Sequence, residues 1–336
     1  MAITPATDTI DILVTGASGY LGQHMLDHWM KTGPIDTKHF YRVTALYNSS
    51  TSFANAIAEK ASRCHPNVQI IAEKYSLQES VTDGNNLGDD AWDVCIHLAA
   101  MSSPRMCQQD REKAHDVNVP KQFLKSMQNV AMIVLSTDQV YDGKREDNDR
   151  LEDFYKETSQ TNPLNAYAET KVLLEQSLKE LRHSSPTICL RSSIILGPPA
   201  PLCHAHDTFF QFCHSRKDQE TKLWANEYRT VLSVGHACRV IDWMVTYLIT
   251  STNPKGMFEI FNLGGPHRVN RVDMGKVVFQ HFGFSTDCLK PAIQTAPTVP
   301  LDISMDSTKL LKWTGIAHMP PTMKELVKYS FPNTHP

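Results

Sequence analysis

The stretch IDILVTGASGYLG, residues 10–22, decides the fold. Its first five residues are mostly aliphatic, as in a buried strand, and residues 21–31 place apolar side chains at helical spacing. Between the two, Gly16, Gly19 and Gly22 follow the spacing GxxGxxG. A strand, a glycine turn and a helix in this order let the backbone approach a pyrophosphate, which then lies at the helix N-terminus. The stretch therefore predicts a dinucleotide-binding unit rather than a tight turn without a ligand.

Strands and helices are predicted to alternate along the rest of the chain. A long helix is expected at residues 164–181. The β-rich runs predicted as further strands are residues 41–47, 68–72, 93–99, 131–136, 187–196 and 258–263. Strands that alternate with helices indicate βαβ units, so the expected fold class is α/β, a doubly wound parallel sheet of the Rossmann type with a smaller C-terminal lobe.

Proline-rich connections indicate where the sheet domain ends. Residues 197–201 (GPPAP) form a natural exit from the sheet, and residues 291–300 form a second such connection. We therefore expect residues 1–196 and about 231–266 to form an NAD(P)-binding domain. The remaining stretches, about 197–230 and 267–336, are expected to form a discontinuous substrate-binding lobe.

The composition is that of a soluble globular protein. Of 336 residues, 41% are hydrophobic and 21% are charged, which excludes wholesale disorder. The 33 Lys and Arg residues form no basic stripe, so a nucleic acid is not an expected partner. No apolar run approaches the ~20 residues of a membrane span, and the N-terminus lacks the pattern of a signal peptide. The 8 cysteines contain no CxxC pair, which favours a reducing compartment, and we expect a cytoplasmic protein.

Two further motifs place reactive side chains near the predicted turn. Tyr167 and Lys171 are four residues apart and are therefore neighbours on one helix face. A nearby ammonium lowers the pKa of a phenol, which makes Tyr167 a usable proton donor at neutral pH. Thr137 and Asp138 follow the strand predicted at 131–136, at the edge where parallel sheets bind ligands. Each motif alone also fits ordinary surface or strand-end residues, but together and in this order they predict one common site.

These residues resemble the shared motifs of the extended short-chain dehydrogenase/reductases: TGASGYLG, HLAA at 97–100, Thr137, and Tyr167 with Lys171. Within that group the chain is most similar to the dTDP-4-dehydrorhamnose reductase family, which includes the methionine adenosyltransferase β-subunit-like proteins. The stretches that carry the similarity are LSTDQVYDG (135–143), FYKETSQTNPLNAYAETK (154–171), LRSSIILGP (190–198) and, more loosely, LDISMDSTKLLKWTG (301–315).

The resemblance implies an NAD(P)H-dependent reductase of a 4-keto-6-deoxy nucleotide sugar. It makes Tyr167 the proton donor, while Lys171 lowers its pKa and binds the ribose, and Thr137 hydrogen-bonds the carbonyl oxygen. The expected substrate contacts are Arg105, Asp138 and Arg229. The residues expected to bind the cofactor are Gly16, Ser18, Gly19, Tyr20, Leu21, Gly22, Asn48, Leu98, Ala99, Ala100, Tyr167 and Lys171.

Two other functions stay open on the sequence. The same family includes regulatory proteins, so one alternative is a non-catalytic NADP-binding subunit whose partner is a methionine adenosyltransferase catalytic chain. The other is a reductase or epimerase that acts on a different carbonyl substrate. A homodimer is the expected assembly if the chain self-associates.

The end of the second predicted strand bears on the choice of cofactor. An acid there would bind the ribose hydroxyls of NAD and repel a 2′-phosphate, but residues 47–50 are Tyr-Asn-Ser-Ser. Asp36 lies 20 residues after Gly16 but precedes that strand, so we interpret it as a loop residue. We therefore expect a preference for NADP(H) over NAD(H).

The remaining polar candidates have structural interpretations. Residues 203–206 (CHAH) with residues 213–214 (CH) resemble a metal site in composition but lack the paired spacing of zinc ligands, so no metal is expected. Glu157 with Asp153 is a candidate acid/base pair, although Glu157 equally fits a role in ordering the loop before the helix at 164–181. Asn118 is expected to be a buried, hydrogen-bonded structural residue.

Overall fold

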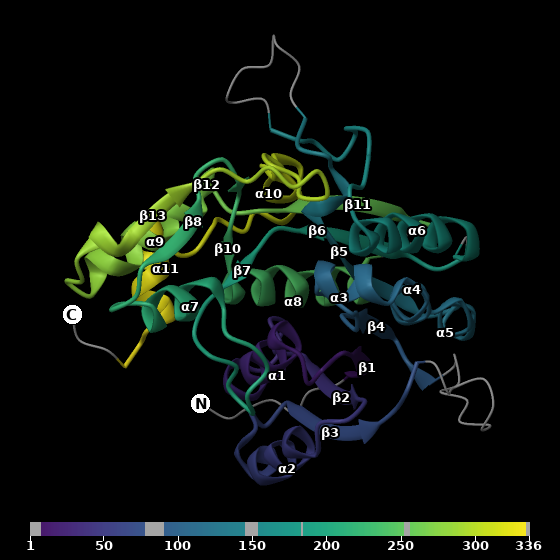
Figure 1. Ribbon diagram of the computed structural model, residues 1–336. Helices are drawn as coiled ribbons and strands as arrows, with labels where there is room; N and C mark the ends of the chain where they lie inside the picture. The colour runs from purple at the N-terminus through teal and green to yellow at the C-terminus, as the bar shows by residue number, and fades with distance from the viewer. Residues whose placement is uncertain (1–7, 78–90, 145–153, 183, 252–255, 334–336) are drawn as a thin grey trace.

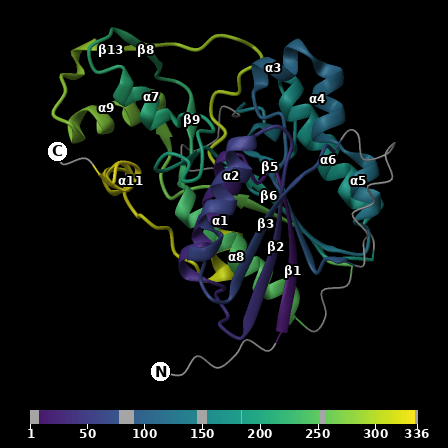
Figure 2. The same ribbon diagram turned by 90° about the horizontal axis from the view of Figure 1, so that it is seen from below.

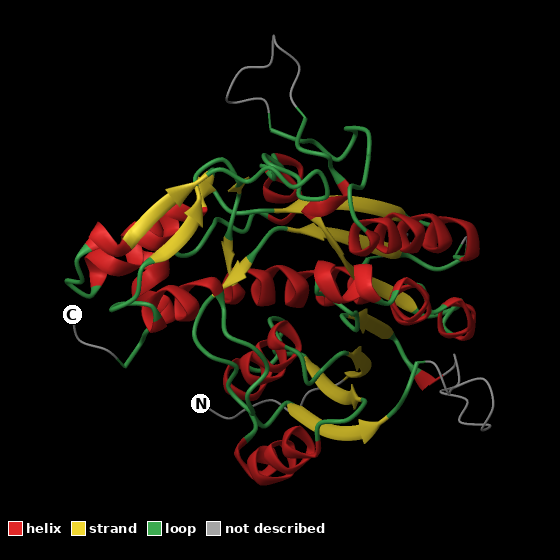
Figure 3. Cartoon of the chain, viewed as in Figure 1, coloured by secondary structure: helices red, strands yellow, loops and turns green. Residues whose placement is uncertain are grey.

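The computed structural model describes residues 8–77, 91–144, 154–182, 184–251 and 256–333. A twisted sheet flanked by helices lies beside a smaller lobe, which is at the left in Figure 1. Figure 3 shows that the lobe has short strands and helices of its own. Within the described ranges, no helix has both the length and the hydropathy that a bilayer crossing requires.

A seven-stranded sheet forms the larger part of the molecule, in the order β3-β2-β1-β4-β5-β6-β11. Its strands are β1 (Asp8–Thr15), β2 (His39–Tyr47), β3 (Val68–Lys74), β4 (Val94–His97), β5 (Ala131–Thr137), β6 (Thr187–Ser192) and β11 (Phe258–Leu263). Each neighbouring pair is parallel. Because the strand order reverses between β1 and β4, the sheet has a topological switch point there. The predicted fold class, a doubly wound parallel α/β sheet, is confirmed.

Helices cover both faces of the sheet because its strands are apolar on both sides. Ile12 and Val14 of β1 belong to one buried cluster, whereas Leu13 between them belongs to another on the opposite face. The first cluster includes residues of α1 and α8, and the second includes residues of α5 and α6. Figure 2 shows these two pairs of helices on opposite sides of the sheet. The flanking helices are α1 (Tyr20–Thr32), α2 (Thr51–Lys60), α3 (Pro104–Gln109), α4 (Arg111–Asn118), α5 (Lys121–Ser126), α6 (Ala166–Leu181) and α8 (Val234–Thr250).

The lobe has a separate core, in which Phe210, Met274 and Phe279 are fully buried. Its elements are α7 (Phe209–Ser215), β8 (Thr221–Trp224), β9 (Tyr228–Arg229), β12 (Val269–Asn270), α9 (Arg271–His281), β13 (Leu289–Ala292), α10 (Thr308–Thr314) and α11 (Met323–Ser330). The short strands β7 (Ile195–Leu196) and β10 (Leu232–Ser233) pair with each other in a separate two-stranded sheet. Among the described residues, the short 3-10 helices are η1 (Ala61–Arg63), η3 (Asp138–Val140) and η4 (Thr286–Cys288). The packing of α10 differs from the predicted division of the chain into a sheet domain and a lobe. Although α10 lies in the range expected for the lobe, its Leu310 joins the core of the sheet and its Trp313 stacks on Phe261 of β11, with ring centroids 4.7 Å apart.

The chain leaves the sheet earlier than the sequence predicts. The strand expected at 187–196 ends at Ser192, and β7 is a separate short strand that pairs with β10. The break coincides with the end of the partner strand β11, because Ser193 N–H donates to the carbonyl oxygen of Leu263, its last residue, at 3.0 Å. With no partner to extend the ladder, the chain turns, and this turn brings Ser193 and Ile194 to the ligand edge of the sheet.

Candidate active site

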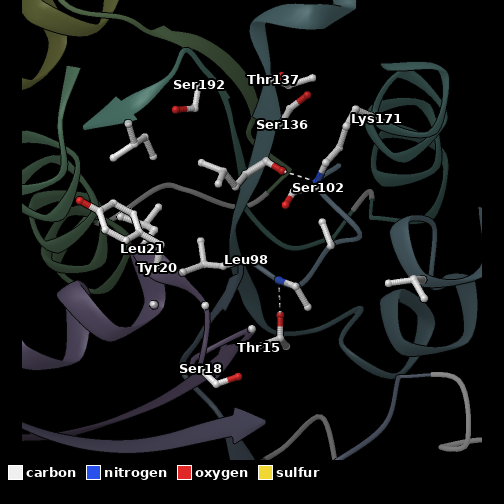
Figure 4. A pocket seen from close by; sticks show the side chains of 18 of the residues that line it. Thr15, Ser18, Tyr20, Leu21, Leu98, Ser102, Ser136, Thr137, Lys171 and Ser192 are labelled. Carbon is white, nitrogen blue, oxygen red and sulfur yellow. Dashed lines mark hydrogen bonds between the residues drawn. The ribbon is translucent and has the colours of Figure 1, made fainter. Parts of the chain in front are cut away.

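A cavity of about 590 Å³ lies at the carboxyl ends of β1, β4 and β5, where an open parallel sheet binds its ligands. Its volume falls in the range of cofactor pockets, roughly 300–1,000 Å³. In Figure 4 the turn after β1 lies on one side of the cavity, and Ser136, Thr137 and Lys171 lie on the other. The lining includes every residue expected to bind the cofactor: Gly16, Ser18, Gly19, Tyr20, Leu21, Gly22, Asn48, Leu98, Ala99, Ala100, Tyr167 and Lys171.

The glycine turn brings three backbone segments into close contact. Gly16 has a φ of 66°, in the left-handed region, and a Cβ there would lie 2.6 Å from the Ala99 backbone nitrogen. A Cβ on Gly22 would lie 2.6 Å from the Gly16 carbonyl oxygen. Larger residues at these two positions would therefore push α1 and the end of β4 away from β1.

The first turn of α1 faces this cavity without a capping side chain. Within the described chain, the N-cap residue Gly19 has no side-chain cap hydrogen bond, and the first turn holds no acidic residue. The backbone N–H groups of that turn and the dipole of the 13-residue helix therefore favour an anion. A dinucleotide pyrophosphate fits this end of the cavity, since it requires close backbone approach and an unopposed helix N-terminus.

Two buried side chains hold the segment after β4 beside the turn. Thr15 Oγ1 accepts a hydrogen bond from the Ala99 N–H at 3.3 Å and lies 2.8 Å from His97 Nδ1. Burial lowers the pKa of His97 to about 3, with the charge of Lys171 as a smaller cause. The neutral ring and the Thr15 hydroxyl therefore fix the path of Leu98–Ala100 along the cavity.

The residues expected to be catalytic meet at the other end of the cavity. Thr137 ends β5, and α6 carries Tyr167 and Lys171, all three of them buried. Asn165 caps this helix, because its side chain accepts a hydrogen bond from the Ala168 N–H at 3.0 Å. The cap fixes where the helix begins, and so which residues of its first two turns face the end of β5.

Burial has the largest effect on the ionisation of the two α6 residues. It raises the pKa of Tyr167, while a hydrogen bond with Thr137 acts in the opposite direction. The amino group of Lys171 donates to the Leu135 carbonyl oxygen at 2.8 Å (Figure 4), and burial lowers the pKa of Lys171 to about 8. The structure thus differs from the expectation that Lys171 lowers the pKa of Tyr167: the hydrogen bond with Thr137 opposes part of the rise caused by burial, while the Lys171 amino group is held by β5.

Asp138 connects the cavity to buried charges of the lobe. Its carboxylate accepts a hydrogen bond from Ser193 Oγ at 2.9 Å and lies 3.8 Å from Arg229 Nε. Burial raises the pKa of Asp138, and the charge of Arg229 opposes that shift. Arg229 also lies 3.3 Å from Glu227, which pairs with Arg271 at 2.9 Å. We call these four charged residues, Asp138, Glu227, Arg229 and Arg271, the lobe junction.

Two of the three expected substrate contacts lie away from the cavity. Arg229 is buried, and its guanidinium donates to three backbone carbonyl oxygens, among them that of Pro300 at 3.0 Å. Arg105 is exposed on α3. Among the described lining residues Asp138 is present, but neither arginine is. Because the protein itself satisfies the Arg229 side chain, this residue holds the lobe junction together rather than facing the cavity.

Several lining residues were not predicted from the sequence. They are Tyr75, Ser76, Leu77, Ser102, Gln139, Ser192, Ser193, Ile194, Ile195 and His206, among others. Ser192–Ile195 reach the cavity because the chain breaks between β6 and β7, and the strand pattern gives no sign of that break. His206 comes from the proline-rich segment after β7 and reaches the cavity by folding back onto α1, where its ring lies 5.4 Å from that of Tyr20.

The remaining candidates have structural contacts. Asn118 is buried, as expected, and accepts a hydrogen bond from the Met101 N–H at 2.7 Å. Glu157 accepts a hydrogen bond from the Asn262 N–H at 2.9 Å, and Asp153 lies outside the described residues. In the part of the chain that the structure describes, no three His, Cys, Asp or Glu residues are arranged to hold a metal ion.

The chain matches a known family over most of its length. The match is to the NAD dependent epimerase/dehydratase family and covers residues 12–264, from β1 to the end of β11. No curated protein matches the chain.

Solved structures with the same fold cover nearly the whole chain. The dTDP-4-dehydrorhamnose reductase from Bacillus anthracis, in complex with NADP, has a TM-score of 0.69 at 16% identity and covers 97% of this chain and 100% of its own. UDP-glucuronic acid 4-epimerase from Bacillus cereus, in complex with UDP-glucuronic acid and NAD, has a TM-score of 0.72 at 18% identity, with coverage of 96% and 98%. A hypothetical dTDP-4-dehydrorhamnose reductase from Sulfolobus tokodaii has a TM-score of 0.65 at 20% identity, with coverage of 90% and 94%. At these identities the likeness establishes the fold alone.

The family match includes the parts of the chain that form the cavity. It contains the glycine turn, Thr137, Tyr167 and Lys171, and it confirms the resemblance to the extended short-chain dehydrogenase/reductases. The chain therefore belongs to the NAD-dependent epimerase/dehydratase family and is an NAD(P)-dependent oxidoreductase of the short-chain dehydrogenase/reductase type.

Proposed function

We propose that the protein reduces the keto group of a 4-keto-6-deoxy nucleotide sugar, of the dTDP-4-dehydrorhamnose type, with NAD(P)H. One observation carries the proposal: a single cavity joins an anion-receptive helix N-terminus to Thr137, Tyr167 and Lys171. A dTDP-4-dehydrorhamnose reductase among the structures with the same fold gives further support.

The side chains at the end of β5 and on α6 divide the work on the carbonyl group. The bound cofactor supplies a hydride to the carbonyl carbon. The Thr137 hydroxyl hydrogen-bonds the carbonyl oxygen, and Tyr167 donates a proton to the developing alkoxide. Burial raises the pKa of Tyr167, so the phenol holds that proton at neutral pH. Lys171 is charged below its pKa of about 8, contacts the cofactor ribose and stabilises the developing negative charge.

Asp138 is the proposed contact to the sugar, because it lines the cavity next to Thr137.

The same lining supports NADP(H) as the preferred cofactor. The described lining residues at the ends of β2 and β3, among them Asn48 and Ser76, include no acid to repel a 2′-phosphate. Titrating the protein with NADPH and with NADH tests this preference. Tighter binding of NADH would contradict it.

We also propose that residues 1–196 and about 231–266 act as the cofactor domain, and that residues 197–230 and 267–336, without α10, act as the substrate lobe. The two separate buried cores support this division.

A cytoplasmic location is supported by the 8 free cysteines.

The test of the reductase proposal is turnover. Purified protein is mixed with NADPH and a dTDP-4-keto-6-deoxy sugar, and the loss of NADPH absorbance is followed. We expect Tyr167→Phe to be slower by about a hundredfold or more, because it removes the proton donor. The control is Tyr247→Phe on α8, which loses a phenol outside the cavity and should keep the wild-type rate. A wild-type rate in Tyr167→Phe would overturn the assignment.

Two parallel measurements separate the alternatives. UDP-glucuronic acid with NAD tests for epimerisation of a different nucleotide sugar. Affinity purification from the source cells tests for a methionine adenosyltransferase partner. No turnover on either sugar, together with stoichiometric recovery of that partner, would replace the reductase by the regulatory subunit.

A further inference from the structure

A proline-rich segment that follows β7 crosses the cofactor end of the cavity. Residues 198–206 (PPAPLCHAH), here called the strap, lead from β7 towards α7. In Figure 1 this part of the chain descends from the lobe to α1 and α2. It is fastened to both helices, because the Tyr20 hydroxyl donates to the Pro198 carbonyl oxygen at 2.9 Å and Lys60 Nζ donates to the Pro201 carbonyl oxygen at 3.1 Å.

Gln23 on α1 joins the strap to the glycine turn. Its side chain is fully buried, and its Oε1 accepts hydrogen bonds from the N–H groups of Leu202, at 3.0 Å, and Cys203, at 2.9 Å. Its Nε2 donates to the Ser18 carbonyl oxygen at 2.7 Å. One side chain therefore holds the strap in a fixed position relative to the turn that favours an anion.

The strap ends with an imidazole at the cavity. His206 lines the same cavity as Gly16, Gly19 and Tyr20, and its ring contacts that of Tyr20. Among the described lining residues, His206 and Lys171 are the side chains that carry positive charge when protonated. Lys171 is held at the end of β5, whereas His206 lies beside the first residue of α1.

We propose that His206 binds the cofactor by donating a hydrogen bond to the dinucleotide pyrophosphate, and that Gln23 positions it there through the strap. An anion at the N-terminus of α1 receives backbone N–H groups from the turn, and His206 adds a side-chain donor whose bond is charge-assisted when the ring is protonated. This proposal rests on the dinucleotide binding of the family and is independent of which sugar is the substrate.

Such a contact makes cofactor binding depend on pH. Although the His206 side chain is exposed, partial desolvation lowers the pKa of free His206, with Asp207 raising it and His204 lowering it further. From α1, the titratable groups packed nearby are Tyr20 and His24, whose rings are 4.7 Å apart, and burial lowers the pKa of His24 as well. A bound anion favours protonated His206, so its pKa is higher in the complex and binding takes up a proton. Affinity is therefore highest at acidic pH and falls as pH rises through the pKa of the complex.

The test is calorimetric titration of the protein with NAD⁺ between about pH 5.5 and about pH 7, a range in which Lys171, with a pKa of about 8, stays protonated. NAD⁺ is the probe because the 2′-phosphate of NADP⁺ itself titrates near pH 6. Repeating each titration in buffers of different ionisation enthalpy counts the protons taken up. Wild-type Kd should rise by roughly three- to tenfold over this range, with a fractional proton taken up near its acidic end.

Two histidine variants locate the effect. At every pH, His206→Ala should bind NAD⁺ as weakly as the wild type does at the upper end of the pH range, and its binding should take up no proton. His204→Ala is the matched control, because His204 is, like His206, an exposed histidine of the strap but lies outside the described lining. It should keep the proton uptake and the fall of affinity with pH, with the midpoint moved to higher pH because His204 lowers the pKa of His206. Wild-type affinity and proton uptake in His206→Ala would overturn the proposal, as would a wild-type protein whose affinity does not change with pH.

Gln23→Met tests the positioning role. With His206 intact but the strap released, we expect loss of the pH dependence and of the proton uptake. A purely structural role for Gln23 would lower Tm and leave the proton uptake unchanged, and that result would contradict the positioning. Because these titrations contain no sugar, their failure leaves the reductase proposal intact, and absence of sugar turnover leaves this one intact.

Discussion

The glycine turn and the lobe junction treat their polar groups in opposite ways. Among the described residues, no side chain caps the backbone N–H groups at the start of α1, whereas the buried charges of the lobe junction pair with one another. Gly19 begins α1 with neither a side-chain cap nor an acidic residue in the first turn. At the lobe junction, Asp138 and Glu227 both have Arg229 as a partner, and Glu227 also has Arg271. Both regions bring polar groups together at the edge of the same sheet.

The difference shows which polar groups are free to bind a ligand. A buried polar group that already has its partners gains little from a ligand, whereas uncapped backbone donors gain a hydrogen bond when an anion arrives. Residue type alone does not distinguish the two cases. Arg229 carries the charge expected of a phosphate or sugar ligand, yet its donors contact the protein's own carbonyl and carboxylate oxygens.

Breaking the paired region is expected to have the largest effect. Arg229→Ala removes the ion-pair partner of buried Asp138 and one of the two ion-pair partners of Glu227, so we expect the free energy of unfolding to fall by about 3–5 kcal/mol. Urea denaturation measures it. Arg105→Ala, on the exposed surface of α3, is the control and should change stability by no more than about 0.5 kcal/mol. Equal stability of the two variants would show that the charges of the lobe junction do not depend on one another.

Placing a side chain in the glycine turn is expected to have the second-largest effect, on the affinity for the cofactor. Gly19 has a φ of −74°, and a Cβ there would lie 3.1 Å from the Gly16 carbonyl oxygen, which a small shift accommodates. Gly19→Leu therefore keeps the fold but places a side chain where the pyrophosphate would lie. We expect NADPH affinity to fall by about a hundredfold or more, or about 2.7 kcal/mol, in a fluorescence titration. A Tm close to that of the wild type is the control, and unchanged affinity would contradict the assignment of this end of the cavity.

Replacing Lys171 is expected to have the smallest effect. Unlike the Arg229 variant, this variant should be more stable than the wild type. Its pKa falls from 10.5 to about 8 on burial, so its charge destabilises the folded state at neutral pH. Lys171→Met should therefore raise the free energy of unfolding at neutral pH by roughly 1–2 kcal/mol, after allowing for the lost hydrogen bond to Leu135.

The pH dependence of that difference is a further check. Between pH 8 and 10.5 the unfolded chain still holds the Lys171 proton that the folded chain has released, so wild-type stability gains on the variant as pH rises. The advantage of Lys171→Met should shrink across this range in urea denaturation at each pH. A variant less stable than the wild type at neutral pH would mean that Lys171 has a stronger partner than the Leu135 carbonyl oxygen.

The local features of this protein could be predicted from the sequence. The spacing of Gly16, Gly19 and Gly22 predicts the turn between β1 and α1, and the β-rich runs predict the strands of the parallel sheet. The predicted cofactor residues all line one cavity because they end neighbouring strands or begin helices at one edge of that sheet. Such features depend on residues close together in the chain, whose periodicity and steric needs can be recognised without knowing the fold.

The tertiary structure alone decided which polar residues face the cavity and in which protonation state. Asp138 pairs with Arg229, His206 is brought to Tyr20 by the strap, and the strand expected at 187–196 breaks where β11 ends. Lys171, predicted to lower the pKa of Tyr167, instead donates to a backbone carbonyl oxygen, and burial raises the pKa of Tyr167. Burial, charge pairing and the end of a strand ladder all depend on which distant segments pack together, and residues far apart in the chain leave no joint pattern in its sequence.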